Sequence, residues 1–402
     1  MRSSALAHWA FDDRGTIGLP GAANLRAAAV PSRVAVLYGG PSPEHDVSIL
    51  TGLQAVQGVA RASGIGRVHS LYWSKSGDFY EIQVSTEAGA FLDGVPGNAA
   101  ALRLISGAGG GFVKPGSGFR AKEERLDLDA VLVCCHGGPG EDGTLQGALD
   151  LAGVAYAGPT AMGAALGMDK LAFGALMGHA GLPALPRVEL NERSQEPGFA
   201  PPFIVKPRFG GSSIGVEVVA DFATARARLR ANTHLRRGAV LEPYHEEMFD
   251  LQVGARTWPE LQLSAVERPL RTRSGGEILG YLDKYVGSEG MTSAPRELPA
   301  KIEPDIEQRI RVLATDVASL VALRGVSRLD FLSDGEDVFV NEINTIPGSL
   351  ARYLWIEPRL PFDLLMVDLL TEAVERPAAA YSAAGADGSV LRAAGSIAGK
   401  LG

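Results

Sequence analysis

The stretch NEINTIPGS, residues 341–349, places a carboxylate at Glu342 and a carboxamide at Asn344, and it then ends in Pro-Gly-Ser. Side chains two residues apart point to the same face of a β-strand, so both oxygen-bearing groups would face one side. Mg²⁺ suits this arrangement, because it takes one or two protein ligands and the rest from phosphates and water. Acidic pairs are also common on exposed strands, so the spacing alone leaves a polar surface strand as the alternative.

The residues upstream favour a binding site over a polar surface. Residues 328–332 and 338–344 are apolar-rich and alternating, and a turn cluster at 333–337 separates them, which predicts a β-hairpin. Pairing of the like faces would gather one guanidinium and three oxygen ligands: Arg328, Asp330, Glu342 and Asn344. Metal and arginine together stabilise the negative charge on a transferring phosphoryl group.

The composition limits the class of protein. A chain of 402 residues, with 46% hydrophobic and 21% charged, is typical of a soluble globular protein of two or three domains. A formal net charge of −8 argues against nucleic-acid binding, which normally needs a basic face. No continuous apolar run is long enough to span a membrane, and the N-terminal residues lack the apolar core of a signal peptide.

The two cysteines, Cys134 and Cys135, are adjacent in an apolar run. Neighbouring side chains on a strand face opposite ways, and the sequence has no third cysteine to pair with either. We therefore expect both thiols to be reduced and buried, and the protein to be cytoplasmic.

The N-terminal part has the pattern of an open α/β sheet. A buried strand at 34–38 is followed by Gly39-Gly40 and a helical pattern from about Val47, and a second strand at 130–135 leads through a glycine-rich loop into a helix at 144–151. A strand, a glycine turn and a helix start are typical of a loop that faces phosphate or substrate.

The middle of the chain has a different pattern. A helical segment opens residues 161–187, with Lys170 near its middle, and FIVKPRFGGSSIGVEVV, residues 203–219, predicts an antiparallel strand pair with a glycine- and serine-rich tip. Lys206 lies on the first strand, and the backbone N–H groups of the tip could wrap phosphate oxygens. The spacing differs from that of a Walker A loop. A strand ending at Glu242 follows, and residues 302–323 have the periodicity of a core-facing helix.

Six of these motifs, in order, resemble the D-alanine–D-alanine ligases of the ATP-grasp superfamily: VAVLYGGPSPEHDVSI, HGGPGEDGTLQGALDLAGVAYAG, GMDK, FIVKPRFGGSSIGV, RLDF and NEINTIPG. The resemblance spans about residues 33–375. It implies a mixed α/β, ATP-grasp fold of three domains. These are an N-terminal α/β substrate domain at 33–160, a central ATP-grasp subdomain with the glycine loop at 161–240, and a C-terminal ATP-grasp subdomain with the metal site and a mobile loop at 241–376.

The two ends of the chain fall outside these domains. Residues 377–402 are rich in Ala, Gly and Ser and can bury little, so we expect a flexible tail. We expect residues 1–32 to be an N-terminal extension, with an arm, a mis-assigned start and a disordered leader as the alternatives.

The resemblance also implies an activity. Such ligases use ATP to convert an amino acid carboxylate into an acyl phosphate, which the amine of a second amino acid then attacks. The expected product is D-alanyl-D-alanine for peptidoglycan precursors. The expected cofactors are ATP as substrate and Mg²⁺ or Mn²⁺, with two ions, and the expected partners are small amino acids and a second copy of the chain in a homodimer.

The site residues are carried over position by position. The resemblance implies ATP contacts from Lys170, Lys206, Gly210, Gly211, Ser212, Glu242 and Asp250, and metal ligation by Asp330, Glu342 and Asn344. It implies catalytic roles for Glu44, Ser213, Arg328, Lys284 and Tyr285. Within that set Glu44 receives the donor's ammonium, Ser213 ties the glycine loop to the N-terminal domain, and Lys284 and Tyr285 belong to the mobile loop at 277–292. It implies substrate contacts from Glu44, His136, Gly348, Ser349 and Tyr353.

Three of these residues also have plain structural interpretations. His136 could cap the helix that follows it, Glu44 could be an acid favoured at a helix N-terminus, and Tyr285 could be a packing residue. His245, Trp355 and the cysteines have no predicted chemistry.

Two departures from the family pattern bear on the substrate. Tyr353 stands roughly where the family has a serine that helps to bind the acceptor's carboxylate, and Ser349 could compensate for it. PYHEEMFD, residues 243–250, departs from the usual Gly-Arg-Glu pattern beside the ribose. A paralogous ligase for a different amino acid or amine is therefore an alternative. A catalytically silent nucleotide-binding module is a second one, although it would have no chemical need for Arg328 and the three metal ligands.

Overall fold

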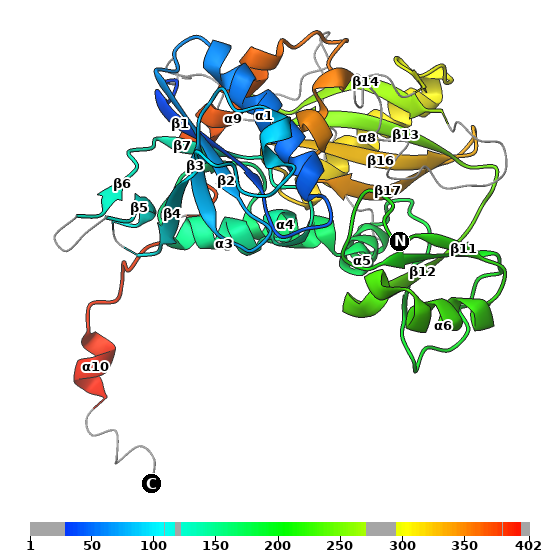
Figure 1. Ribbon diagram of the computed structural model, residues 1–402. Helices are drawn as coiled ribbons and strands as arrows, with labels where there is room; N and C mark the ends of the chain where they lie inside the picture. Colours follow the sequence, from blue (N-terminus) through cyan, green and yellow to red (C-terminus); the bar gives the residue numbers. More distant parts are fainter. Residues whose placement is uncertain (1–28, 108, 117–121, 271–294, 380, 395–402) are drawn as a thin grey trace.

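The computed structural model describes residues 29–107, 109–116, 122–270, 295–379 and 381–394. Their strands form three sheets of eight, four and five strands. Figure 1 shows the eight-stranded sheet on the left, the five-stranded sheet at the upper right and the four-stranded sheet at the lower right. The expected mixed α/β architecture, with one open α/β sheet and two antiparallel sheets, is confirmed.

The first sheet has the order β6-β5-β4-β3-β2-β1-β7-β8. Strand β1 (Arg33–Gly39) pairs in parallel with both β2 (Arg67–Trp73) and β7 (Ala130–Val133). It is apolar along almost its whole length because both of its faces are covered. The remaining strands are β3 (Phe79–Ile82), β4 (Ala100–Ile105), β5 (Gly111–Lys114), β6 (Glu124–Arg125) and β8 (Tyr156–Ala157), and the short 3₁₀ helix η1 spans Ala88–Phe91.

Helices α1 (His45–Arg61) and α9 (Phe362–Glu375) pack together over this sheet. A Cβ atom at Gly58 of α1 would lie 2.8 Å from the Phe362 ring, so glycine permits the close approach of the two helices. Helix α9 therefore belongs to the core of the first sheet, although its residues lie in the range predicted for the C-terminal domain.

The four-stranded sheet is antiparallel and has the order β11-β10-β12-β9. Strands β10 (Phe203–Pro207) and β11 (Glu217–Val219) confirm the predicted pair with a glycine-rich tip. Strand β12 (Ala239–Pro243) pairs with β10 and with β9 (Val188–Leu190), so the predicted domain boundary at 240/241 falls inside a strand of this sheet. The apolar interior of the sheet is closed by α6 (Phe222–Ala231) and η2 (Thr233–Arg237).

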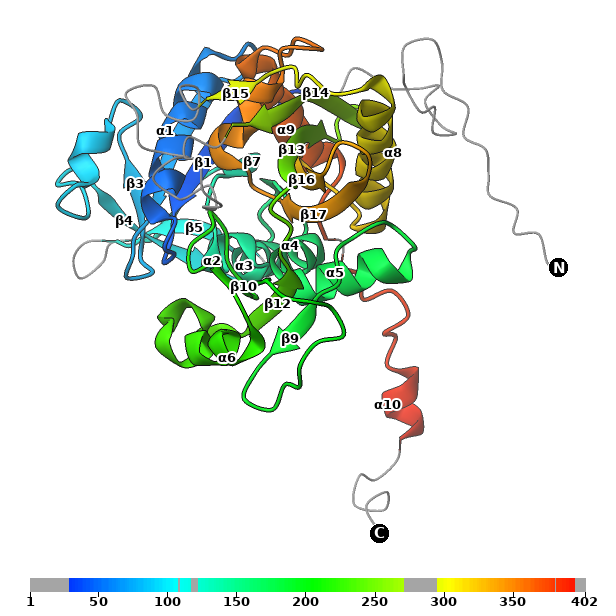
Figure 2. The ribbon, with the colours of Figure 1, turned by 90° about the vertical axis from the view of Figure 1, so that its right-hand side faces the viewer.

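The five-stranded sheet contains the hairpin predicted for residues 328–344. Strands β16 (Val326–Ser333) and β17 (Val338–Asn344) pair with Arg328 opposite Asn344 and Asp330 opposite Glu342, as the like-face pairing predicted. The other strands are β13 (Phe249–Arg256), β14 (Gln262–Pro269) and β15 (Arg296–Glu297). Helix α8 (Pro304–Leu320) buries its apolar face against this sheet, and Figure 2 shows it on the outer side of the layer.

The helical segment after residue 160 consists of two helices, α4 (Ala161–Met168) and α5 (Lys170–His179). The prediction that Lys170 lies near the middle of one helix is wrong. Asp169 has an extended backbone (ψ 95°), and its carboxylate accepts the N–H groups of Leu171 and Ala172, so it ends one helix and caps the next. Lys170 therefore lies in a first turn, at a corner between the sheets.

The remaining helices are α2 (Gly138–Glu141), α3 (Thr144–Leu151), η4 (Gly348–Leu354) and α10 (Ser389–Ala393). The last of these stands apart from the body of the protein in Figure 1. Within the residues that the structure describes, no helix is both long and apolar enough to cross a membrane.

Candidate active site

Two cavities meet at the junction of the three sheets. The larger, of about 1070 Å³, lies between the four-stranded and five-stranded sheets. The smaller, of about 600 Å³, lies where the glycine loop, β17 and the N-terminal domain converge. The larger cavity is lined by most of the residues predicted for ATP, by the predicted catalytic residue Ser213 and by two predicted metal ligands. In that order they are Lys170, Lys206, Gly210, Gly211, Glu242 and Asp250, then Ser213, then Asp330 and Glu342.

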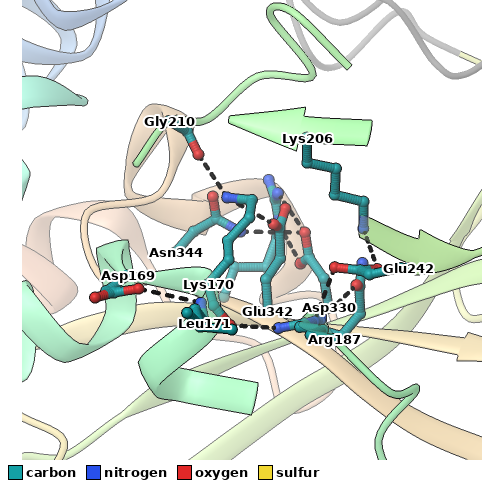
Figure 3. Close-up of polar contacts among 12 residues, drawn as sticks. Asp169, Lys170, Leu171, Arg187, Lys206, Gly210, Glu242, Asp330, Glu342 and Asn344 are labelled. Atoms are coloured by element: carbon teal, nitrogen blue, oxygen red, sulfur yellow. Dashed lines mark hydrogen bonds and ion pairs between the residues drawn. The ribbon is translucent and has the colours of Figure 1, made fainter. Parts of the chain in front are cut away.

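A buried carboxylate between two cations forms one wall of the larger cavity. Lys206 Nζ donates to Glu242 Oε2 at 2.7 Å, and Arg187 Nε lies 2.8 Å from Glu242 Oε1 (Figure 3). Burial alone would raise the pKa of Glu242, but the charges of Lys206 and Arg187 outweigh burial and the pKa is lowered. Sequence reasoning missed Arg187, which precedes β9 in a stretch without a motif.

Lys170 connects the glycine-rich tip between β10 and β11 to the hairpin of β16 and β17. Its Nζ donates to the carbonyl oxygen of Gly210 at 2.6 Å and lies 3.3 Å from Glu342 Oε2 (Figure 3). The break at Asp169 aims the lysine at this point. A cation placed here can contact anionic groups of a ligand held under the glycine loop.

The hairpin gathers its four predicted residues. Arg328 donates from Nε and Nη2 to the two oxygens of Asp330, at 2.7 and 2.8 Å, and Asn344 Nδ2 donates to Asp330 Oδ2 at 3.1 Å. No group of three or more His, Cys, Asp or Glu that could hold a metal occurs among the described residues. Two carboxylates and an amide nevertheless suit Mg²⁺ that obtains its other ligands from phosphates and water.

In the smaller cavity Glu44 meets the glycine loop. Glu44 is the residue before α1, and its Oε1 accepts a hydrogen bond from the Ser212 hydroxyl. Gly137 has a φ of 62°, and a Cβ there would lie 2.4 Å from Glu44 Oε2, so only glycine leaves room for this carboxylate. The contact joins the N-terminal domain to the tip between β10 and β11.

His136 and Glu141 hold the two sides of one residue, Ile346. His136 Nδ1 lies 2.7 Å from the Ile346 carbonyl oxygen and Nε2 lies 2.8 Å from Thr51 Oγ1. Burial lowers the pKa of His136 to about 4, so the ring is neutral at pH 7, and its Nδ1–H must donate because a carbonyl can only accept. The ring therefore anchors the chain that follows β17.

Glu141 makes the matching contact. Its Oε1 accepts the Ile346 N–H at 3.0 Å and its Oε2 accepts the Gly137 N–H at 2.9 Å. Burial, and then the charge of Glu44, raise the pKa of Glu141 to about 7. Sequence reasoning missed this residue, although it lies inside the quoted HGGPGEDGT motif.

Comparison with known proteins decides the family. Residues 33–159 match the model described as "D-ala D-ala ligase N-terminus", and residues 181–371 match the model described as "D-ala D-ala ligase C-terminus". A D-alanine--D-alanine ligase of Bradyrhizobium sp. (strain ORS 278) is 32% identical over 366 residues, which cover 86% of this chain and 96% of that relative. One of Mycobacterium sp. (strain KMS) is 32% identical over 383 residues, which cover 86% and 97%. The chain belongs to the D-alanine–D-alanine ligase family.

Solved structures agree with this assignment. A D-alanine–D-alanine ligase from Helicobacter pylori has a TM-score of 0.67 and 25% identity, over 87% of this chain and 100% of that one. The VanG D-Ala:D-Ser ligase from Enterococcus faecalis has a TM-score of 0.69 at 23% identity, over 85% and 99%, and supports the fold. The expected ATP-grasp fold is confirmed, and the protein is an ATP-dependent ligase.

The predicted site residues of this ligase fall into three groups: those that line a cavity, those that are described but line neither cavity, and those outside the described residues. Most line the two cavities, with Glu44, His136, Ser212, Arg328, Asn344 and Gly348 on the smaller one. Ser349 contributes its backbone N–H, which donates to Thr51 Oγ1 at 3.0 Å. Lys284 and Tyr285 lie outside the described residues. The described contact with Glu44 is made by Ser212, the neighbour of the predicted Ser213, whose own role stays a prediction.

Tyr353 differs in position from the other predicted substrate contacts. Among the described residues, those that line the two cavities do not include Tyr353. It packs with Ala351, Leu354 and Leu298, and the Arg296 guanidinium lies 4.9 Å from the centre of its ring. Burial raises the pKa of Tyr353, and the charge of Arg328 opposes the rise. Its role at the acceptor stays a prediction.

Proposed function

We propose that this ligase joins two molecules of D-alanine, with cleavage of ATP to ADP and phosphate, through an acyl phosphate. The observation that carries the proposal is the place of the Arg328 and Asp330 pair. Arg328 lines the smaller cavity and Asp330 lines the larger one, so their ion pair stands at the boundary between the two. A phosphoryl group that passes from a nucleotide to an amino acid carboxylate must cross this boundary.

The residues suit both steps of the reaction. In the first, an oxygen of the donor carboxylate attacks the γ-phosphorus and the bond to the ADP oxygen breaks. In the second, the acceptor's amine attacks the acyl carbon, loses a proton, and inorganic phosphate leaves. Arg328, Lys170 and Lys206 offer positive charge to the phosphoryl oxygens, while Glu44 offers a carboxylate to the donor's ammonium.

Magnesium belongs to this proposal. Asp330, Glu342 and Asn344 would hold it, and the bound ion would neutralise charge on the phosphates. We expect each of Glu342→Gln and Asn344→Ala to lower turnover at least about 100-fold, since even outer partners of metal ligands contribute 10- to 100-fold. Turnover would be measured against magnesium concentration. Unchanged turnover at saturating magnesium would show that this face of the hairpin is merely polar.

The family also supports a setting for the reaction. D-Alanyl-D-alanine is the dipeptide of peptidoglycan precursors, and we place its synthesis in the cytoplasm, with the enzyme as a homodimer. Size-exclusion chromatography with light scattering would test the oligomeric state.

Phosphate release tests the proposed substrate. The full chain would be incubated with ATP, magnesium and D-alanine, then with L-alanine, D-serine and other amino acids, and the dipeptide identified by mass spectrometry. We expect D-alanine alone to support release and D-alanyl-D-alanine to accumulate. Release with another amino acid, but none with D-alanine, would replace D-alanine as the substrate. Tight ATP binding without turnover for any pair would revive the silent module.

A further inference from the structure

Arg187 is a buried cation that contacts Glu242, a residue lining the larger cavity, and the reaction above gives Arg187 no role. Its side chain is 3% exposed and that of its partner Glu242 is 1% exposed. Besides the pair with Glu242, Nη1 donates to the Lys170 carbonyl oxygen at 3.2 Å, and Nη2 donates to the backbone and side-chain oxygens of Asn341. One guanidinium thus connects the start of α5, strand β12 and strand β17 (Figure 3).

The charges of Lys206, Arg187 and Glu242 do not cancel. Lys206 and Arg187 each take one oxygen of the Glu242 carboxylate, so the three groups together carry one positive charge. Lys206 also lines the cavity that we assign to the nucleotide. Its ammonium has three N–H donors but only one positive charge, so charge that Lys206 shares with phosphate oxygens compensates Glu242 less well.

If Lys206 turns from Glu242 toward the phosphates, the Glu242 carboxylate loses one of its two partners. A carboxylate that is 1% exposed has little access to water that could replace its partner, and a buried charge without a partner is strongly destabilising. Arg187 removes this problem because it already occupies the other oxygen. Arginine suits the task, since its guanidinium stays charged and its planar fork can bind three acceptors at once.

We propose that Arg187 is a positioning residue. It neutralises Glu242 permanently, so that Lys206 is available to contact the phosphates of a bound nucleotide. The inference rests on the proposed function, because it takes the occupant of the cavity to be a nucleotide. It predicts that Arg187 matters to the phosphate end of the ligand without contacting it.

The test measures binding to the full chain by isothermal titration calorimetry, with ADP and magnesium and, separately, with adenosine. Arg187→Met should raise the Kd for ADP about 10- to 150-fold, the range for one lost charged hydrogen bond. The Kd for adenosine, which has no phosphate, should stay within about threefold. Arg230→Met is the matched control, because Arg230 is an exposed arginine of α6, on the same four-stranded sheet, and pairs with Glu192. It should bind ADP like the wild type.

A double-mutant cycle distinguishes two roles of Arg187: neutralising Glu242, or only connecting α5, β12 and β17 through hydrogen bonds. If Arg187 only neutralises Glu242, then Glu242→Gln removes the need for it. Adding Arg187→Met to the Glu242→Gln variant should then change the ADP Kd less than about threefold. An equal loss in both backgrounds would overturn the inference, as would an equal loss for ADP and adenosine. Wild-type protein that binds neither ADP nor ATP would instead overturn the proposed function.

Folding is checked by thermal melting of each variant. Arg187→Gln is the second variant should Arg187→Met fail to fold, since the amide is neutral and can still donate to the Asn341 carbonyl. The same cycle with Glu242→Gln applies to it. ADP binding by Arg187→Gln at the wild-type Kd, with Glu242 intact, would overturn the inference.

Discussion

The residues around the two cavities are connected by different kinds of contact. Around the larger cavity the side-chain contacts are between full charges, with Glu242 between Arg187 and Lys206, and Lys170 near Glu342. Around the smaller cavity the connections run through a neutral histidine, backbone amides and a carboxyl whose pKa is raised to about 7. The first arrangement suits a multiply charged anion, and the second suits an amino acid with one group of each sign.

This difference predicts which property each cavity should lose when one of its residues is changed. The loss of a cation beside the larger cavity leaves a buried acid unbalanced, and the effect should fall on nucleotide affinity. The smaller cavity depends on protonation states, so its weaknesses should show as a dependence on pH. Arg328 belongs to both cavities through Asp330, and it gives the strongest test of the boundary between them.

We expect Arg328→Met to have the largest effect, a loss of about 10³-fold in turnover, comparable to the removal of one preorganised group that stabilises a transition state. Steady-state phosphate release would measure it. Arg309→Met is the control, because Arg309 is a half-exposed arginine near Asp337, and it should retain full activity. If Arg328→Met loses only affinity for ADP, Arg328 serves the larger cavity alone and the boundary is drawn wrongly.

Sequence reasoning found the parts of the site that local spacing determines. The hairpin with Arg328, Asp330, Glu342 and Asn344 could be predicted because the alternation of residues fixes which side chains share a face. The antiparallel pair around Lys206 could be predicted for the same reason.

The missed features depend on contacts between residues far apart in the chain. Arg187 reaches Asn341 across 154 positions, and Glu141 reaches Ile346 across 205, and neither contact leaves a periodic pattern in the sequence. The break at Asp169 was missed for a different reason. Its capping role is local, but the strong helical pattern on both sides concealed it.

The second prediction concerns how stability depends on pH through His136 and Glu141, the two residues that hydrogen-bond to the backbone of Ile346. Glu141 has a folded pKa of about 7 against 4.5 when unfolded, so the folded protein holds a proton that the unfolded chain has released, and stability falls as pH rises between these values. His136 has a folded pKa of about 4 against 6.5, so the unfolded chain binds the extra proton, and stability rises with pH between 4 and 6.5. Each shift is worth about 3 kcal/mol, and the two oppose each other.

Single variants should therefore separate two opposite slopes. Urea unfolding midpoints between pH 4.5 and 6.5 should rise with pH in Glu141→Gln, where His136 acts alone, and fall with pH in His136→Gln, where Glu141 acts alone. The wild type should lie between them. Parallel profiles for all three proteins would mean that the smaller cavity is no more sensitive to pH than the larger one.

The third prediction compares two neighbouring serines. Ser212→Ala removes the hydrogen bond to Glu44 and leaves that buried acid to shift, so we expect the KM for the donor amino acid to rise about 10-fold. Ser213 lines the larger cavity, so Ser213→Ala should act on the KM for ATP instead. Initial rates with each substrate varied in turn would show the split. The opposite split would restore Ser213 as the residue that ties the loop to the N-terminal domain.

The smallest effect should come from Tyr353, which the sequence placed at the acceptor. Its ring packs between Arg296 and the apolar side chains of Leu298 and Leu354, and its buried hydroxyl forms no well-aligned hydrogen bond within the described residues. Tyr353→Phe keeps the ring, so the KM for D-alanine as acceptor should change less than about twofold, well under the roughly 10-fold that a charged hydrogen bond supplies. Tyr353→Ser removes the ring as well and should lower stability by about 3–5 kcal/mol, as other large-to-small changes in cores do. A rise of about 10-fold in acceptor KM for Tyr353→Phe, with an unchanged melting temperature, would show that the hydroxyl reaches the substrate and that the smaller cavity extends to this ring.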